Sequence, residues 1–349
     1  MLKLKSPNFS DNLLSVKNSI KISLVYIGII IGAGFASGQE ILQFFNTNNP
    51  KSIIGIIVCA FLFGLISFCV LSIILRTKVT STTQFFNDGT FATIINWLII
   101  GFMICSYVAM VSASGAIFKE YFNFPQILGV GIFSAFCLII FLFNARGIII
   151  LNSILTPIMI IGVLLLGVYK LSTAAVPTMA SMQMIHQNWL ISSIVYASYN
   201  VLTCVSVMTA LRAYIINLRT VIISSIISFI VLLGLLLTMW LMLKTSTGNL
   251  GEIPMLTVLH SLRNFYLPLL YIAMLTTATS NGFGVIHSLP INSKISAIVI
   301  ALIGVILGML PFSGIVAIAY SMFGVLGLGV MGYILYKQIF GSLSPKNSK

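Results

Sequence analysis

The sequence has few charged residues and very few acidic ones. Of its 349 residues only 7% are charged, and Asp and Glu together account for 5. A soluble domain carries roughly a quarter charged residues, so a water-soluble fold is excluded. Hydrophobic residues make up 59% of the chain, in recurring runs as long as transmembrane helices, roughly 18 residues or more. These features predict an all-α integral membrane protein with the lipid bilayer as its solvent.

Dense basic blocks, metal-ligand spacings and nucleophile–base pairs are also missing. The 18 Lys and Arg residues give a formal charge of +13, but they are scattered between apolar runs and predict no nucleic-acid partner. The five cysteines lie within apolar runs and are interpreted as small buried hydrophobes. With one carboxylate in the apolar runs and no base beside a nucleophile, an enzyme is the least favoured class.

Ten transmembrane spans are predicted from apolar length and from breaking residues. The chain 1–349 then forms a single membrane domain, with a short surface helix expected at 255–262. The spans cover approximately 22–45, 53–75, 92–118, 126–143, 148–169, 189–211, 221–243, 265–287, 294–310 and 314–339.

Lys and Arg are divided unequally between the two sides of this arrangement. Thirteen fall on the side of the termini and five on the other side. Because cytoplasmic loops carry the excess of basic residues, both termini are predicted to be cytoplasmic.

The chain also repeats itself. "YVAMVS" at 107–112 returns as "YIAMLT" at 271–276, and the same offset carries the opening glycine stretch onto "VYASYNV" at 195–201. Five spans per copy would place the two copies in opposite orientations, so we expect an inverted repeat, about 19–170 and about 188–339. Interruptions are expected at 32–38 and 196–200, in the first helix of each copy, a pattern typical of secondary transporters.

The first interruption lies in "IIIGAGFASGQEIL", residues 29–42. An unwound helix frees backbone groups, whose N–H ends can meet an anionic group and whose carbonyls can coordinate a cation. Glycine permits both the unusual backbone angles and close approach of a ligand. The predicted ligand-binding segment comprises Gly32, Ala33, Gly34, Phe35, Ser37 and Gly38. As an alternative, Gly34 and Gly38 form a helix-packing GxxxG, although such a face would not need the polar Ser37, Gln39 and Glu40.

Glu40 is the one acidic residue that falls within a predicted span. An ionisable group there costs at least ~2.5–3.5 kcal/mol, which makes it a functional candidate. Its carboxylate can accept a substrate amine, bind a coupling cation or carry a proton. Alternatively, it lies at the outer end of the span and caps a water-filled vestibule.

Polar residues in three other spans are further candidates. Tyr107, Tyr196, Tyr199 and Asn200 suit a solute pocket, although an aromatic ring with a polar tip also suits helix packing. The stretch "AMLTTATSN", residues 273–281, offers hydroxyl and carbonyl oxygens for an alkali cation. Its Ser and Thr side chains can equally bond their own helix.

The nonapeptide "GAGFASGQE" resembles the signature of the YkvI-type bacterial membrane proteins, and the resemblance covers essentially the whole chain. These are similar in turn to the amino acid–polyamine–organocation superfamily, which has the leucine-transporter (LeuT) fold. The resemblance implies a multi-pass protein of the bacterial cell membrane. It implies backbone recognition of a substrate at 30–35 and a sodium site. The implied sodium ligands are the carbonyls near Gly32 and Phe35 together with Ala273, Thr276 and Thr277. Glu40 departs from the usual superfamily pattern and leaves proton coupling open.

The sequence therefore predicts a secondary active transporter of a small amino acid or related amine, coupled to sodium, with no cofactor beyond that ion. Its predicted partners are a small solute, a coupling ion and lipid. The alternatives are a proton-coupled transporter of another small organic solute and a non-transporting sensor of the same fold. A channel is disfavoured because the polar residues form islands at mid-depth.

Overall fold

The computed structural model describes residues 9–45, 49–142, 145–173, 188–246, 250–289 and 292–340. Within these ranges the chain forms helices and no strand. Eight helices there are long and apolar enough to cross a membrane, and two more, α7 (Gln126–Phe141) and α13 (Ser293–Leu307), are apolar but shorter. The prediction of an all-α, multi-pass membrane protein is confirmed. The count of ten spans stays a prediction, because α7 and α13 are short for a full crossing.

Seven of the eight long helices match predicted spans, and the eighth, α1 (Phe9–Ile30), overlaps the predicted span 22–45 only over residues 22–30. The eight are α1, α4 (Lys51–Thr77), α6 (Thr90–Glu120), α8 (Ala145–Thr173), α9 (Trp189–Ala210), α10 (Leu218–Lys244), α12 (Arg263–Ser288) and the run of α14 (Phe312–Ile315), the π-helical turn η3 (Val316–Tyr320) and α15 (Ser321–Phe340). The short elements are α2 (Ala33–Ser37), α3 (Gln39–Phe44), α5 (Thr82–Phe85), η1 (Arg212–Tyr214), α11 (Pro254–Val258) and η2 (His260–Leu262). The last two occupy the segment predicted as a surface helix.

Helix α1 begins well before the predicted start of the first span. Serines recur along it at every fourth position, and the hydroxyls of Ser19 and Ser23 donate to the carbonyls of Thr220 and Ser224 on α10, at 3.2 and 3.0 Å. Because these polar side chains bond to a neighbouring helix, α1 extends through a stretch whose mean hydropathy is too low to predict a transmembrane span.

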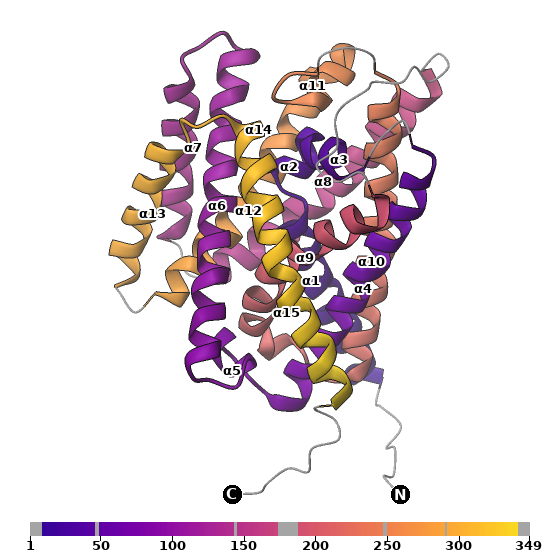
Figure 1. Cartoon of the computed structure of the whole chain (residues 1–349), viewed down its shortest axis with the longest axis vertical. Coiled ribbons are helices and arrows are strands. Elements are labelled where there is room, and N and C mark those ends of the chain that lie inside the picture. Colours follow the sequence, from indigo (N-terminus) through magenta and orange to yellow (C-terminus); the bar gives the residue numbers. More distant parts are fainter. Residues whose placement is uncertain are drawn as a thin grey trace, which may run out of the picture.

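The first span is interrupted where its glycines lie. Helix α1 ends at Ile30, α2 begins at Ala33, and Gly38 separates α2 from α3 with a left-handed φ of +87°. Glycine adopts this conformation without the steric cost that a Cβ imposes. The chain therefore bends twice within one span, at the depth where Figure 1 shows α2 and α3 above α1.

The predicted interruption of the sixth span is wrong. Helix α9 runs unbroken from Trp189 to Ala210, through the segment 196–200. The polar side chains there bond their own helix, since Asn200 Nδ2 donates to the Tyr196 carbonyl at 3.0 Å and Ser198 Oγ to the Val195 carbonyl at 2.8 Å. Without glycine or proline in this segment, nothing opens the backbone.

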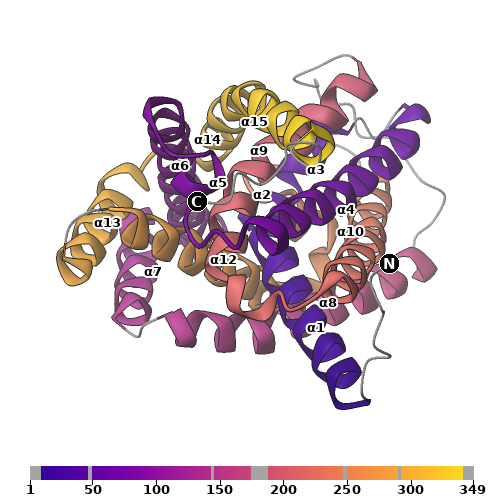
Figure 2. The ribbon, with the colours of Figure 1, turned by 90° about the horizontal axis from the view of Figure 1, so that it is seen from below.

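Four of the five pairs of helices that are five places apart among the predicted spans pack against each other. Helix α4 lies on α10, α6 on α12, α1 on α9 and α7 on α13. The first two pairs are antiparallel, because Ser67 meets Ser225 while Gly64 meets Phe229, and Ser106 meets Asn281 while Ser114 meets Tyr271. Figure 2 shows α7 and α13 at one edge of the bundle and α4 and α10 at the opposite edge.

The two ends of the bundle are referred to below as the terminal face and the opposite face. The terminal face carries the start of α1, α5, η1 and the end of α15, where the Lys337 ammonium donates to the Phe85 carbonyl and to Asn87. The opposite face carries α11 and the start of α14 (Figure 1).

Candidate functional site

A small cavity lies beside the break in the first span, between α6, α9, α12 and η3. Its volume is about 10 Å³, which is room for roughly one water molecule. The cavity is lined by Ile29, Ile30, Gly32, Glu40, Phe102, Ser106, Met110, Tyr199, Asn200, Thr203, Thr277, Asn281 and Tyr320. None of these lining residues is basic.

Glu40 supplies the cavity's one charged side chain and is only 3% exposed. Its carboxylate accepts a hydrogen bond from the Tyr196 hydroxyl at 2.9 Å, and the Tyr199 hydroxyl faces the same carboxylate. The side chain folds back over Gly34, where an added Cβ would lie 2.1 Å from Oε1. The Tyr196 phenol and the space left by Gly34 therefore fix a buried carboxylate that has no basic partner among the residues around the cavity.

Three aromatic rings from three elements line one side of the cavity. The ring centroids of Tyr199 and Tyr320 are 5.0 Å apart, and Phe102 lies 5.6 and 5.8 Å from them. A cation placed against such faces is attracted by the ring quadrupoles. The aromatic wall and the carboxylate therefore favour the same sign of charge.

Asn281 presents an acceptor to this cavity. Its side-chain nitrogen donates to Ser106 Oγ at 2.7 Å, while its oxygen, on a residue only 1% exposed, has no hydrogen-bond partner among the residues that the structure describes. A buried carbonyl without a partner is unfavourable. A donor or a cation in the cavity would satisfy it.

Thr277 links α12 to the end of α1. Its hydroxyl donates to the carbonyls of Gly28 and Ile31, at 2.9 and 3.3 Å. The carbonyls named in the sequence prediction lie one turn further on and are used by the helix itself. Gly32 O accepts from the N–H of Ala36 at 2.8 Å, and Phe35 O accepts from Gly38 at 3.0 Å.

Five of the residues singled out from the sequence line the cavity: Gly32, Glu40, Tyr199, Asn200 and Thr277. Three others contact residues that line the cavity. The N–H of Ala33 donates to the sulfur of Met110 at 3.0 Å, Gly34 lies under the Glu40 side chain, and Tyr196 bonds its carboxylate.

The remaining predicted residues lie elsewhere. Tyr107 points into the scaffold, where its hydroxyl lies 3.1 Å from Ser134 Oγ on α7. The Ser37 hydroxyl donates to the Gly34 carbonyl, and the Thr276 hydroxyl to the Ala273 carbonyl, within their own helices. Phe35 and Gly38 are structural parts of the bend.

The sequence argument missed Phe102, Ser106, Met110, Thr203 and Tyr320. The first three are spaced four residues apart on α6 and so share one face, while Tyr107, which was chosen instead, lies on another. The same spacing relates Tyr199 to Thr203 on α9 and Thr277 to Asn281 on α12. The spacing of four residues from a polar residue on the same helix was the signal in the sequence that could have identified them.

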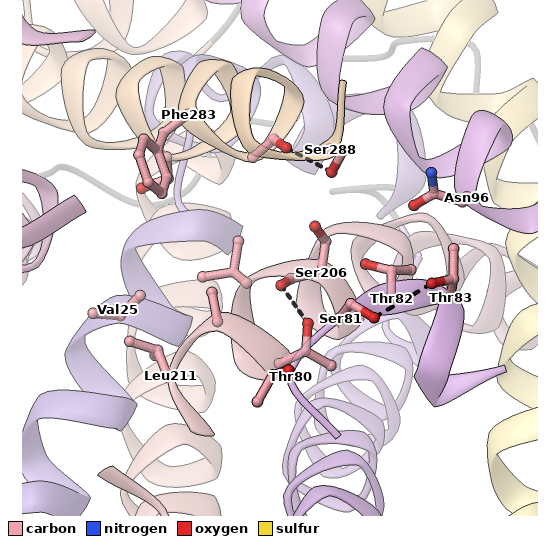
Figure 3. A pocket seen from close by; sticks show the side chains of 15 residues that line it. Val25, Thr80, Ser81, Thr82, Thr83, Asn96, Ser206, Leu211, Phe283 and Ser288 are labelled. Atoms are coloured by element: carbon pink, nitrogen blue, oxygen red, sulfur yellow. Dashed lines mark hydrogen bonds between the residues drawn. The ribbon is translucent and has the colours of Figure 1, made fainter. Parts of the chain in front are cut away.

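A larger vestibule of about 240 Å³ opens below this cavity toward the terminal face. Figure 3 shows Phe283 and Ser288 of α12 on one side of it, with Ser206 of α9 and the segment 80–83 on the other. Ser206 and Thr203 are less than one helical turn apart, so the vestibule ends close beneath the central cavity. Its lining is rich in hydroxyls and contains no ionisable side chain, and Lys78 and Arg212 lie at its mouth.

No family model matches the chain. Two proteins of Bacillus subtilis (strain 168) are similar over nearly their full length: the uncharacterized membrane protein YkvI, 25% identical with 91% of this chain and 95% of YkvI covered, and the uncharacterized protein YyaD, 26% identical with 92% and 97% covered. The sequence resemblance to YkvI-type membrane proteins is confirmed.

Solved structures with the LeuT fold share the architecture. A Na⁺-coupled sialic acid symporter aligns with a TM-score of 0.61 at 13% identity, covering 92% of this chain and 78% of that one. MhsT in complex with L-phenylalanine also gives 0.61 at 16% identity, covering 89% and 87%. A manganese transporter of Eremococcus coleocola gives 0.59 at 15% identity, covering 95% and 81%. At these identities the likeness shows the fold alone, and the fold is that of LeuT.

Proposed function

We propose that this protein is a secondary active transporter of a small amino acid or related amine, coupled to sodium. One observation carries the proposal: a buried carboxylate, Glu40, faces a small cavity at a helix break and has no basic partner in the cavity lining. The LeuT fold, which solved symporters share, agrees with it.

The amine is favoured by the chemistry of the lining. An ammonium group can donate to the Glu40 carboxylate and to the unpartnered Asn281 oxygen, and it can lie against the faces of Tyr199 and Tyr320. The N–H of Ala33 now donates to the Met110 thioether, a weak acceptor. A substrate oxygen in its place would make a stronger bond, which favours an amino acid as well as a simple amine once the cavity, now only about 10 Å³, has widened to admit it.

Sodium would be held by the oxygens where α12 meets the end of α1. Thr277 Oγ1 already lies within hydrogen-bond distance of the carbonyls of Gly28 and Ile31, and hard oxygen donors suit an alkali cation. The Thr276 hydroxyl and the Ala273 carbonyl would complete the set after the threonine side chain turns from its own helix. A bound ion would supply positive charge near the cavity and tie α12 to the broken helix.

Alternating access would follow from two inverted halves, about 19–170 and about 188–339. The antiparallel pairing of α4 with α10 and of α6 with α12 supports this repeat. We place the protein in the cell membrane of a bacterium, with the terminal face in the cytoplasm. The vestibule would then be the cytoplasmic half of the pathway.

The test is thermal stabilisation of the purified protein against a panel of amino acids and amines, in sodium and in potassium. A ligand stabilises by an amount set by its concentration over its dissociation constant. We expect a sodium-dependent rise in Tm for at least one amine, lost in Glu40→Gln. Thr277→Val should remove the sodium dependence, and Thr276→Val should weaken it less, because only Thr277 contacts the carbonyls of α1.

The outcomes separate the alternatives. A rise that depends on pH and not on sodium would favour proton coupling, which the lone carboxylate also permits. Binding without flux in proteoliposomes would favour a sensor. No rise for any amine at any pH would contradict the amine proposal, and flux assays with other solutes would follow.

A further inference from the structure

Gln39, next to Glu40, has no part in the solute site. It is 4% exposed, and its side-chain nitrogen donates to two consecutive carbonyls, those of Gly251 and Glu252, both at 3.1 Å. These residues belong to the connection between α10 and α11 on the opposite face. A buried amide that uses both N–H groups on one loop holds that loop against the broken helix.

The same loop is fixed to two other helices. The Glu252 carboxylate accepts from the N–H and the hydroxyl of Ser313 at the start of α14, at 2.7 and 2.9 Å. The Glu252 N–H donates to a carboxylate oxygen of Glu120 at the end of α6, at 3.3 Å. Residues 251–252 therefore connect the broken first span to α6 and to the tenth span.

The terminal face is arranged differently. There α1, α6, α9 and α12 are separated by the vestibule of about 240 Å³, which reaches nearly to the cavity. Above the cavity, the loop lies over the bend, and the Tyr266 hydroxyl of α12 donates to the Ala36 carbonyl at 2.5 Å. The loop therefore covers the bend on the opposite face, whereas the vestibule extends from the terminal face toward the cavity.

We propose that Gln39 is a positioning residue for transport: together with the loop 250–252 it forms a clasp that holds the opposite face closed. The clasp consists of the Gln39 amide, the carbonyls of Gly251 and Glu252, and the bonds from Glu252 to Ser313 and Glu120. Opening of this face requires these bonds to break.

The clasp is coupled to the solute site through covalent adjacency. Gln39 and Glu40 are the first two residues of the short helix α3. The Gln39 side chain points to the loop, and the Glu40 side chain folds back over Gly34. A ligand that moves the backbone of α3 through Glu40 would also move Gln39. This coupling rests on the proposed function, whereas closure by the clasp does not.

Labelling of single introduced cysteines tests the clasp without any solute. Met110→Cys lines the central cavity and reports entry from the opposite face, and Asn96→Cys lines the vestibule and reports entry from the terminal face. Four of the five native cysteines are buried, and the protein without an introduced cysteine gives the background. In proteoliposomes, a membrane-impermeant maleimide is applied to one face at a time.

Gln39→Leu keeps the side-chain volume but removes both donors. We expect it to raise the labelling rate of Met110→Cys from the opposite face on the order of ten-fold, as the loss of two hydrogen bonds implies. Labelling of Asn96→Cys from the terminal face should fall. Ser313→Ala, which removes one bond at the far end of the clasp, should give a smaller change in the same direction and carries the test if Gln39→Leu does not fold.

Gln126→Leu is the matched control. The Gln126 amide also donates to two consecutive carbonyls, of Gly308 and Met309, both at 3.3 Å, but it joins α7 to the connection after α13. Neither bond reaches residues 251–252, although Gln126 lines one pocket with Glu120 and Glu252. Gln126→Leu should leave both labelling rates unchanged. Equal rates in Gln39→Leu and Gln126→Leu would overturn the clasp. If Gln39→Leu raises the labelling rate of Met110→Cys but no amine raises the Tm in the thermal panel, the clasp stands and only the proposed substrate is overturned.

Discussion

The position of the Glu40 side chain requires a glycine at position 34. The carboxylate occupies the space in which a side chain at position 34 would stand, 2.1 Å from the ideal Cβ. Gly38 serves another purpose, because its φ of +87° turns the chain between α2 and α3. The two glycines of the apparent GxxxG thus make room for a carboxylate and a bend, and Gly38 also lies close against Leu243 of α10 and Met255 of α11.

Gly34→Ala is therefore expected to displace the Glu40 carboxylate. Overpacking of this kind costs about 1–3 kcal/mol of stability, and solute affinity should fall at least roughly ten-fold if one charge-assisted bond is lost. Thermal melting with and without the amine found in the panel measures both effects. Gly131→Ala on α7, with nothing within 4 Å of the new Cβ, is the control and should melt no lower than the native protein. Undiminished affinity in Gly34→Ala would contradict this account of Glu40.

At the scale of helices, α3 is oriented by the bend at Gly38. A Cβ there would be strained by the left-handed backbone and would lie 3.1 Å from the side chains of Leu243 and Met255. The same bend directs Gln39 toward the loop and Glu40 toward the cavity. The orientation of one short helix thus sets the place of both residues.

Gly38→Ala is expected to destabilise the protein by about 2 kcal/mol, since a left-handed L-residue costs roughly 1–2 kcal/mol and the tight contacts add to this. Gly89→Ala, at φ +96° with nothing within 4 Å, provides a comparison in which backbone strain acts without new contacts. At a matched loss of stability, Gly38→Ala should weaken solute binding and Gly89→Ala should not. Equal binding in the two variants would show that the bend does not orient Glu40.

Hydropathy and the positions of helix-breaking residues predicted most of the helices, because crossing a bilayer demands long apolar runs. The glycines at 32–38 located a real break for a local reason, namely freedom of the backbone. The same kind of inference failed at 196–200, where side chains bond back to α9 instead of opening it. Polar composition alone does not distinguish these outcomes.

The candidate site was predicted in part. Glu40 stood out because charge inside a span is costly. Tyr107 was chosen over its neighbour Ser106, yet Tyr107 bonds Ser134 within the scaffold while Ser106 faces the cavity. Tyr320 comes from the last span, and its approach to Tyr199 depends on tertiary packing. Which face of a helix meets a cavity is decided by its neighbours, and one sequence does not contain that information directly.

At the scale of the molecule, basic side chains are concentrated on the terminal face. Arg76, Lys78, Arg212, Arg219, Lys294 and Lys337 lie at or beside helix ends there, and Lys17 and Lys21 lie within α1. On the opposite face are Lys51, Lys119, Lys170, Lys244 and Arg263. This distribution follows the positive-inside rule when the terminal face is cytoplasmic.

Reporter fusions measure that orientation. Green fluorescent protein fused after Lys349 should fluoresce, and alkaline phosphatase at the same position should be inactive. Phosphatase fused after Thr245, at the end of α10 on the opposite face, should be active. The reverse pattern would place the vestibule outside the cell and invert the proposed direction of each half of the pathway.

The unbroken α9 has a kinetic consequence. The first span can bend at two points, whereas its counterpart in the second half moves as one rod. In a transporter built from two such unequal halves, opening one face is not the mirror image of opening the other. The two openings should then have different activation enthalpies, so that exchange at the two sides of the membrane responds differently to temperature.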